Sequence, residues 1–386
     1  MRITQPWLQD PATQAVCAAL TAEGAQALFV GGCVRNALLG APVSDMDIAT
    51  DAHPETVLEL AAKAGIKAVP TGIEHGTVTL IKSGIPHEVT TFRKDVATDG
   101  RRAVVSFASG IAEDARRRDF TMNALYARPD GTVVDPLGGI ADLQARRVRF
   151  IGTAEHRIRE DYLRSLRYFR FHAWYGDAAQ GFDADALAAI AANLDGLQTL
   201  SRERVGSEML KLLAAPDPAP SVAAMRQAGV LAEILPGADD RALAPLVHLE
   251  GSRPPAALRR LAALGGGDMQ EALRLSKAQA RELTRLREAA AGTMTAAELG
   301  YRLGAAAAAD ALLLRAALLE QPLPPGSETD IARGGAAEFP LTARDLMPGF
   351  KGPALGRALK RLEAEWIASG FTLDREDLLD SLKGSE

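Results

Sequence analysis

The sequence predicts an α+β region followed by an all-α region. Up to residue 152, short apolar and β-branched runs alternate with helical patterns and are separated by Gly, Pro and Asp turns. Beyond that point the chain is rich in Ala, Leu and Arg, which are strong helix formers. Aromatic residues make up only 5% of the chain, which also favours helix.

The composition is that of an ordinary soluble protein. At 386 residues, the chain is long enough for two or more domains. Hydrophobic residues make up 47% and charged residues 24%. The formal net charge of −5 does not favour a nucleic-acid binder overall, but local basic patches govern contact with phosphates.

We expect a cytoplasmic protein that does not span a membrane. Cys17 and Cys33 are too few for a disulfide framework, which indicates reduced thiols and an intracellular location. The first residues are polar and carry no secretory signal. Apolar runs without charge are too short to cross a bilayer.

Residues 27–51 form the most informative stretch. Residues 27–30 are apolar and predict a short buried strand, which Gly31 and Gly32 end. Residues 33–39 predict a short helix with Arg35 near its start. Free N–H groups at such a helix start, together with the charge of Arg35, favour binding of a phosphate.

A pair of acidic residues follows in the next predicted strand. Strand alternation places Asp45 and Asp47 on one face. Two neighbouring carboxylates repel each other unless a cation lies between them, and hard oxygen ligands suit Mg²⁺. Glu88, in the strand predicted over 87–93, is a candidate third carboxylate, although a surface glutamate fits the pattern equally well. Metal-binding carboxylates beside a phosphate cradle indicate phosphoryl or nucleotidyl transfer.

Two polar segments follow these strands. Residues 94–109 are predicted to form an irregular loop over the site. Residues 111–126 are predicted to form one helix, with Arg117, Arg118 and Asp119 at the rim of a pocket.

Residues 154–174 predict one long helix with an unusual polar face. Asp161, Arg164, Tyr168 and Phe171 fall along one side, and Arg167 and Arg170 extend the row of arginines. A solvated ladder of ion pairs is one interpretation. Apolar residues around the rest of the circumference instead indicate a buried helix whose charges need partners.

The remaining chain is predicted to be helical. Residues 200–213 form a helix with Ser201 as its cap and an Arg204–Glu208 pair. Residues 221–320 predict a packed helical body. The last segment has a basic face that we expect to contact RNA. That face consists of Lys351, Arg357, Lys360 and Arg361.

Several motifs together resemble one known family. In order they are GGCVRNALLG with DMD, TGIEHGTVTLI with EVTTFR, RRDFTMNAL, DPLGGIADL, EDYLRSLRYFRF and SRERVGSEMLKLL. They cover roughly residues 27–213, and the segment GFKGPALG near the end adds a weaker match. The chain is similar to the class II, or bacterial-type, tRNA nucleotidyltransferases, which are the CCA-adding enzymes, and to the related bacterial poly(A) polymerases.

The resemblance implies an architecture and a set of site residues. The expected domains are a nucleotidyltransferase head with a small mixed β-sheet (1–150), then an all-α neck (151–215), body (216–340) and tail (341–386). Asp45 and Asp47 would hold Mg²⁺, with Glu88 as a further catalytic candidate. The implied nucleotide-binding residues are Gly32, Arg35, Arg118, Asp119, Asn123, Asp161, Arg164, Arg167 and Arg170.

The expected activity is template-independent addition of CCA to tRNA 3′ ends from CTP and ATP, with release of pyrophosphate. The alternative is an enzyme that adds only A, either a poly(A) polymerase or the partner of a CC-adding enzyme. An inactive helical RNA-binding protein is a third interpretation, which the Asp45/Asp47 pair disfavours. The absence of a His-Asp dipeptide predicts no phosphohydrolase activity, and the acidic composition disfavours a poly(A) polymerase. Residues 94–109 match a complete loop, which favours full CCA addition; we expect no protein partner.

Overall fold

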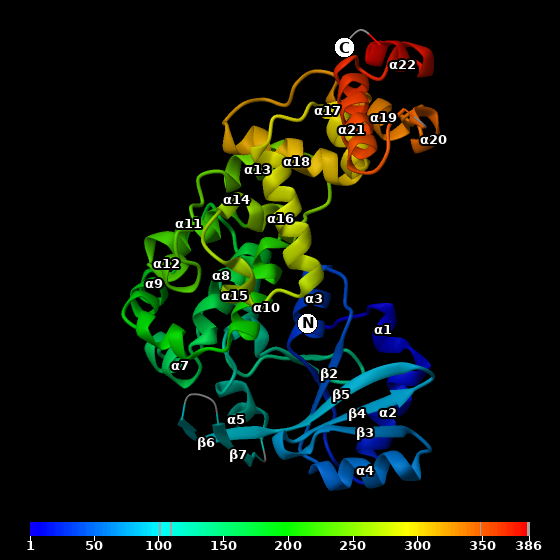
Figure 1. Cartoon of the computed structure of the whole chain (residues 1–386). Helices are drawn as coiled ribbons and strands as arrows, with labels where there is room; N and C mark the ends of the chain where they lie inside the picture. Colours follow the sequence, from blue (N-terminus) through cyan, green and yellow to red (C-terminus); the bar gives the residue numbers. More distant parts are fainter. Residues whose placement is uncertain (100–101, 109, 348, 384–386) are drawn as a thin grey trace. The chain divides into compact units, whose positions relative to one another are not determined.

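The computed structural model describes residues 1–99, 102–108, 110–347 and 349–383. The chain divides into two compact units, Met1–Pro236 and Gly237–Glu386. The first unit combines strands with helices, whereas the described part of the second unit is built from helices (Figure 1). This arrangement confirms the predicted α+β region followed by an all-α region.

The first unit contains a mixed sheet. Its strand order is β3-β4-β5-β2-β1-β8-β9, and β2 and β5 run parallel while the other neighbours are antiparallel. The strands of this unit, including the separate β6–β7 hairpin, are β1 (Leu28–Val30), β2 (Met46–Thr50), β3 (Lys67–Gly72), β4 (Thr77–Lys82), β5 (Ile85–Thr91), β6 (Arg93–Asp99), β7 (Arg102–Phe107), β8 (Tyr126–Ala127) and β9 (Val133–Val134).

Helices α2 and α4 cover one face of this sheet (Figure 1). The helices of the first unit are α1 (Pro6–Gln9), α2 (Pro11–Thr21), α3 (Gly32–Leu39), α4 (Pro54–Lys63), α5 (Ile111–Arg116), α6 (Gly139–Gln144), α7 (Ala154–Glu160), α8 (Leu163–Tyr175), α9 (Ala184–Ala191), α10 (Arg202–Leu213), α11 (Ala219–Gln227) and α12 (Val230–Ile234). Short 3₁₀ helices lie at η1 (Ile73–His75), η2 (Thr121–Asn123) and η3 (Leu194–Thr199).

Strand alternation gives the two faces of the sheet different roles. On the face covered by α2, Thr13 contacts the side chains of Met46 and His87. Leu28 of β1 pairs with Ala49 of β2. Ala49 lies three residues after Met46, so strand alternation points Ala49 and its partner Leu28 to the opposite face. Asp47 shares this opposite face, because it lies two residues before Ala49 on β2.

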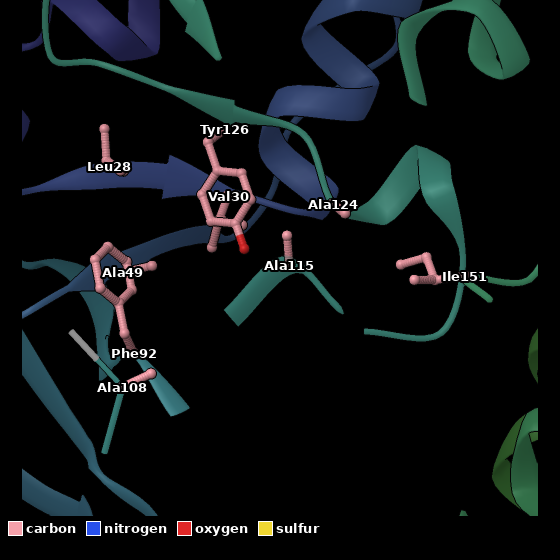
Figure 2. Packing of buried hydrophobic residues seen from close by; sticks show 9 residues of the cluster. All are labelled: Leu28, Val30, Ala49, Phe92, Ala108, Ala115, Ala124, Tyr126 and Ile151. Carbon is pink, nitrogen blue, oxygen red and sulfur yellow. The ribbon is translucent and has the colours of Figure 1, made fainter. Parts of the chain in front are cut away.

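A buried apolar cluster fixes helix α5 against this second face. Figure 2 shows Val30, Ala49 and Tyr126 from the sheet. Beside them lie Phe92, which follows β5, and Ala115 of α5. Phe92, Ala115 and Tyr126 are fully buried. Burial of each large apolar side chain contributes roughly 1.5–3 kcal/mol. The cluster therefore holds the end of α5, with its acidic and basic residues, next to the strand that carries Asp47.

The prediction of an irregular loop over residues 94–109 is wrong. Strands β6 and β7 form an antiparallel hairpin there, and Arg93 pairs with Phe107 in its register. Residues 100, 101 and 109 of the predicted loop lie outside the described residues. β-branched residues lie on both sides of an Asp-Gly dipeptide, with Val96 and Thr98 before it and Val104 and Val105 after it, which is a hairpin signal.

The single helix predicted over residues 111–126 is also wrong. Helix α5 ends at Arg116, and Phe120 has an extended backbone with φ −120° and ψ 148°. The amide of Thr121 donates to the carbonyl of Arg149 at 3.0 Å, so it does not form a helical bond. Tertiary pairing with a distant segment thus overrides the local helical pattern.

The long helix predicted over residues 154–174 is interrupted. Asp161 separates α7 from α8 and has an extended backbone, with φ −154° and ψ 105°. Its carboxylate accepts the backbone N–H of Leu163 at 3.1 Å, in the manner of a helix cap. Asp161 therefore lies at the start of α8 and not within one continuous helix.

The second unit has its own buried ionic cluster. Glu250 accepts hydrogen bonds from Arg259 and Arg260, and Arg259 also pairs with Asp310 at 2.6 Å. The helices described in the second unit are α13 (Leu243–Glu250), α14 (Ala257–Leu264), α15 (Met269–Leu273), α16 (Lys277–Ala291), α17 (Ala296–Leu303), α18 (Ala305–Leu318), α19 (Ser327–Ala336), α20 (Ala343–Leu346), α21 (Pro353–Ala368) and α22 (Arg375–Lys383). The cluster links α13, α14 and α18.

Candidate active site

Acidic residues lie side by side on two parallel strands. In the register of β2 and β5, Asp47 is the partner of Glu88. Asp45 directly precedes β2, is exposed, and accepts a hydrogen bond from Ser44 at 2.8 Å. The structure therefore brings Glu88 beside the predicted aspartate pair.

The electrostatic environment of Asp47 disfavours its charged form. Partial burial, then the negative charge of Glu88, raises the pKa of Asp47 to about 6, and Asp45 adds to the effect while Arg118 opposes it. A cation would relieve this repulsion, so the donor set fits a metal ion that prefers oxygen ligands. Within the described part of the chain, no three acidic, histidine or cysteine side chains converge as a metal cluster. Glu88 therefore neighbours the pair without completing a three-ligand site.

A glycine turn follows β1, which pairs with the acidic strand β2. Gly31 precedes α3 with φ +72° and ψ −121°, a conformation that side chains other than hydrogen rarely tolerate. A Cβ atom on Gly31 would lie 3.6 Å from Nη1 of Arg118, and one on Gly32 would lie 3.7 Å from Nη2 of Arg35. The turn thus brings backbone close to two guanidinium groups.

Arg35 is buried and held by its own protein partners. It is 6% exposed. Its Nη1 donates to Asn123 at 2.5 Å and its Nη2 to Tyr175 at 2.8 Å, and the guanidinium lies 4.0 Å from the centre of the Tyr175 ring. Burial lowers its pKa, and Tyr175 partly offsets that effect. Arg35 thus fixes Asn123 and does not project from the turn as an exposed phosphate ligand.

Asp119 is the centre of a buried polar network. It is 7% exposed, and its Oδ1 accepts from the side chain of Asn123 at 2.9 Å. Its Oδ2 accepts from Nε of Arg167 at 2.7 Å. Burial alone would raise the pKa of Asp119, but Arg167 and Asn123 hold it below its usual value. The predicted residues Arg35, Asn123, Asp119 and Arg167 are therefore one connected set.

The other polar residues of α8 have separate partners. Arg170 donates to Glu208 of α10 at 2.5 Å, and Asp161 pairs with Arg204 of the same helix at 2.6 Å. The predicted Arg204–Glu208 pair is therefore replaced by two contacts that join α10 to α8.

Arg164 and Asp161 are near each other in sequence but do not bond through their side chains. Arg164 contacts Glu160 and donates to the carbonyl of Arg117 at 3.1 Å. These contacts favour the interpretation in which the charges need partners over the alternative of a solvated ladder, because each charge contacts another element or the backbone.

Several residues of the site were missed by sequence reasoning. Asp114 and Tyr126 bind Arg118, and Tyr175 binds Arg35. Asp114 had a signal, since it precedes Arg117 and Arg118 by three and four residues. No local sequence pattern indicates the roles of Tyr126 and Tyr175, because their contacts depend on how different elements pack together.

The predicted RNA-binding residues lie in the second unit, on and just before α21. Lys351, Arg357, Lys360 and Arg361 are all exposed. Nε of Arg361 donates to Glu365 of the same helix at 2.9 Å. The basic face is thus accessible but partly neutralised.

A large cavity lies elsewhere in the first unit. It has a volume of about 790 Å³ and lies between residues 149–155 and α9. Thr121, Arg149 and Asp183 are among its lining residues. The predicted site residues do not line it, so it is not the place where the acidic pair and the glycine turn meet.

Two family models match the chain. Residues 27–149 match the family described as "Poly A polymerase head domain". Residues 181–241 match the family described as "Probable RNA and SrmB- binding site of polymerase A". The first match contains the acidic strands, the glycine turn and Asp119.

Curated relatives and solved structures agree with these models. The chain is 45% identical to mouse mitochondrial CCA tRNA nucleotidyltransferase 1 over 186 residues, covering 48% of this chain and 43% of the mouse protein. It is 41% identical to the CCA-adding enzyme of Geobacillus thermodenitrificans over 220 residues, covering 56% and 52%. The crystal structure of the Bacillus stearothermophilus CCA-adding enzyme in complex with CTP is similar, with a TM-score of 0.80, 29% identity and 99% coverage of both chains.

The fold and the site define a protein with a head domain of the poly(A) polymerase type. Residues 27–149 match this head-domain family, and the chain is similar in sequence and in fold to CCA-adding enzymes. Its alignments span about half the length of the curated relatives that it matches. The carboxylates of Asp45 and Asp47 fit a divalent metal ion that prefers oxygen ligands. None of the helices in the described ranges is long and apolar enough to cross a membrane.

We predict that Asp119→Asn destabilises the protein in a pH-dependent way. Loss of the buried charge leaves Arg167 with only the more distant carboxylate of Glu208, at 4.0 Å, and costs about 3 kcal/mol at pH 7. The pKa of Asp119 is lower in the folded state than in the unfolded state, so its contribution is present above about pH 4 and is lost as the pH falls further. The difference between wild type and variant should therefore shrink from pH 7 to pH 3 in urea denaturation.

The control is Glu23→Gln, which breaks the exposed pair between Glu23 and Lys63. We expect this change to have little effect at either pH. An Asp119→Asn penalty of equal size at pH 7 and pH 3 would contradict the assignment of a stabilising buried charge.

Proposed function

We propose that this protein adds CCA to the 3′ ends of tRNA from CTP and ATP and releases pyrophosphate. The observation that carries the proposal is the placement of Asp45 and Asp47 beside the Gly31 turn, with Arg118 within electrostatic reach of Asp47. Carboxylates for a metal ion next to donors for a phosphate are what nucleotidyl transfer requires. The relatives named as CCA-adding enzymes support the choice of substrate.

The metal ion in this proposal is Mg²⁺, held by Asp45 and Asp47. When bound, it supplies activation of the attacking 3′-hydroxyl and stabilisation of the leaving pyrophosphate. Gly31 and Gly32 provide close approach to backbone for the triphosphate. Arg118 donates to the nucleotide, and Arg35 acts indirectly by fixing Asn123.

Base selection is assigned to Asp161 and Arg164. Cytosine and adenine both present an amino donor beside a ring acceptor, which match a carboxylate and a guanidinium. Uracil and guanine present a ring N–H and a carbonyl, which leave both side chains unpaired. Asp161 can keep its contact with Arg204 and still accept the amino group, because a carboxylate has about four acceptor sites.

The proposal also covers the rest of the chain. Residues 1–150 are the catalytic head, 151–215 the neck, 216–340 the body and 341–386 the tail. The match of residues 181–241 to an RNA-binding family supports tRNA contact beyond the head. The exposed face of Lys351, Arg357 and Lys360 is a second RNA contact. A cytoplasmic location is part of the same proposal.

The first test uses tRNA transcripts that end at the discriminator base, after C, or after CC. Each is incubated with the full chain, Mg²⁺, and CTP and ATP singly or together, and the 3′ ends are sequenced. We expect all three to grow to CCA and then stop. Removal of Mg²⁺ with EDTA, or the double change Asp45→Asn and Asp47→Asn, should abolish extension.

The matched control is Asp51→Asn. Asp51 directly follows β2 and accepts from the backbone of Gln26 at 2.7 Å, at the other end of the strand from Asp45. This variant should remain active. Extension only with CTP, extension only by A after CC, or long A tracts on any RNA would each refute complete CCA addition.

We expect Asp161→Ala to lose base selection while catalysis of transfer persists. Without the carboxylate, the amino group that distinguishes C from U has no acceptor, so discrimination against UTP should fall about 10- to 100-fold. The measurement is the ratio of kcat/KM for CTP and UTP. Arg204→Met removes the same ion pair but keeps the carboxylate, and it should retain selection. Normal preference for C and A in Asp161→Ala would rule out this role.

A further inference from the structure

Asp114 is a buried carboxylate that binds several donors at once. It lies in α5 and is 1% exposed. Its Oδ1 accepts from Nε of Arg117 at 2.8 Å and from the backbone N of Arg93 at 3.3 Å. Its Oδ2 accepts from Nη2 of Arg118 at 2.9 Å and from the hydroxyl of Tyr126 at 2.7 Å. Such a group has little freedom to move.

These contacts orient the guanidinium of Arg118. Its Nε also donates to Asp114 at 3.2 Å and to the Tyr126 hydroxyl at 3.1 Å. The Nε and Nη2 donors of the guanidinium group are therefore both hydrogen-bonded. Nη1 has no acceptor among the described residues. It faces Gly31, where a Cβ atom would lie 3.6 Å away. The free donor therefore points to the glycine turn and not into the core.

The ionised state of Asp114 matches this role. Burial alone would raise its pKa, but the charges of Arg118 and Arg117 and the Tyr126 hydroxyl hold the pKa well below its usual value. Asp114 is thus an anion throughout the neutral range. Its charge offsets part of the positive charge of two arginines beside the acidic strands.

We propose that Asp114 is a positioning residue that aims Nη1 of Arg118 at an oxygen of the nucleotide bound at the Gly31 turn. The proposal deepens the function proposed above and rests on it. Through the backbone of Arg93, the same carboxylate also ties the first residue of β6 to this guanidinium. Tyr126 shares the task, because its hydroxyl donates to Asp114 and accepts from Nε of Arg118.

The test compares Asp114→Asn with Asp142→Asn in the full chain. Asp142 is 3% exposed and accepts from Thr121 at 2.7 Å and from Arg149 at 2.8 Å. It is therefore a buried, arginine-bound carboxylate of the same region that does not contact Arg118. Both variants lose a buried anion, so a general loss of packing should affect them alike.

We expect Asp114→Asn to weaken CTP binding by about 10- to 100-fold, because an amide cannot accept from four donors and the guanidinium loses its orientation. Calorimetric titration with CTP and Mg²⁺ in the absence of tRNA measures this change. In tRNA extension, KM for CTP should rise more than kcat falls. Asp142→Asn should leave CTP affinity unchanged.

A double-mutant cycle separates positioning from a merely structural role. In the Arg118→Lys background, Asp114→Asn should weaken CTP binding little further, because the group that it positions is already altered. Tyr126→Phe retains the buried ring and should weaken binding less than Asp114→Asn. It serves as the test if Asp114→Asn does not fold.

The nucleotide oxygen can belong to the triphosphate or to the ribose. If Nη1 contacts the ribose 2′-hydroxyl, the Asp114→Asn penalty disappears with dCTP. If it contacts the triphosphate, the penalty persists with dCTP and shrinks with CMP. Either result supports the positioning of Arg118 on the nucleotide.

Unchanged CTP affinity in both Asp114→Asn and Tyr126→Phe would overturn the proposal. So would equal weakening in Asp114→Asn and Asp142→Asn, or additive effects in the cycle. Because binding is measured without tRNA, these outcomes differ from a failure of the proposed function, in which the wild type binds CTP but does not extend tRNA to CCA.

Discussion

The site depends on the buried carboxylate of Asp119. One oxygen binds Asn123 of η2, which in turn binds Arg35 of α3, and the other oxygen binds Arg167 of α8. A single anion therefore joins the helix after the glycine turn to α8, which carries Arg164 of the proposed base-reading pair. A buried ion is costly unless it is well hydrogen-bonded, and the carboxylate of Asp119 accepts from the backbone N of Phe120 and from the side chains of Asn123 and Arg167.

The same principle explains how an acidic chain presents an arginine-rich site. Arg118 binds Asp114, Arg167 binds Asp119, Arg170 binds Glu208, and Arg204 binds Asp161. Each guanidinium is held in one orientation by a carboxylate, so its remaining donors are already placed when a nucleotide arrives. Donors that need no reorganisation stabilise developing charge more than mobile ones do. A net charge of −5 is thus compatible with binding of an anionic substrate, because these arginines gather at the site while most acidic residues lie elsewhere in the chain.

Sequence reasoning succeeded where local patterns determine structure. The glycine turn, the acidic strand and helix α10 were predicted close to their observed bounds, since alternation, turn residues and caps act within a few residues. It failed where tertiary contacts decide. The carboxylate of Asp161, at the break between α7 and α8, pairs with Arg204 of α10, and the end of α5 depends on Thr121 pairing with Arg149. The burial of Arg35 could not be predicted, because Tyr175 lies 140 residues away.

The most direct test of the central claim is a crystal structure of the full chain with CTP and Mg²⁺. We predict that the triphosphate binds at the Gly31 turn beside Asp45 and Asp47, with Nη1 of Arg118 bonded to the nucleotide. We also predict that Asp119 remains bound to Arg167. CTP in the cavity between residues 149–155 and α9, or a broken Asp119–Arg167 pair with nucleotide bound, would contradict these predictions.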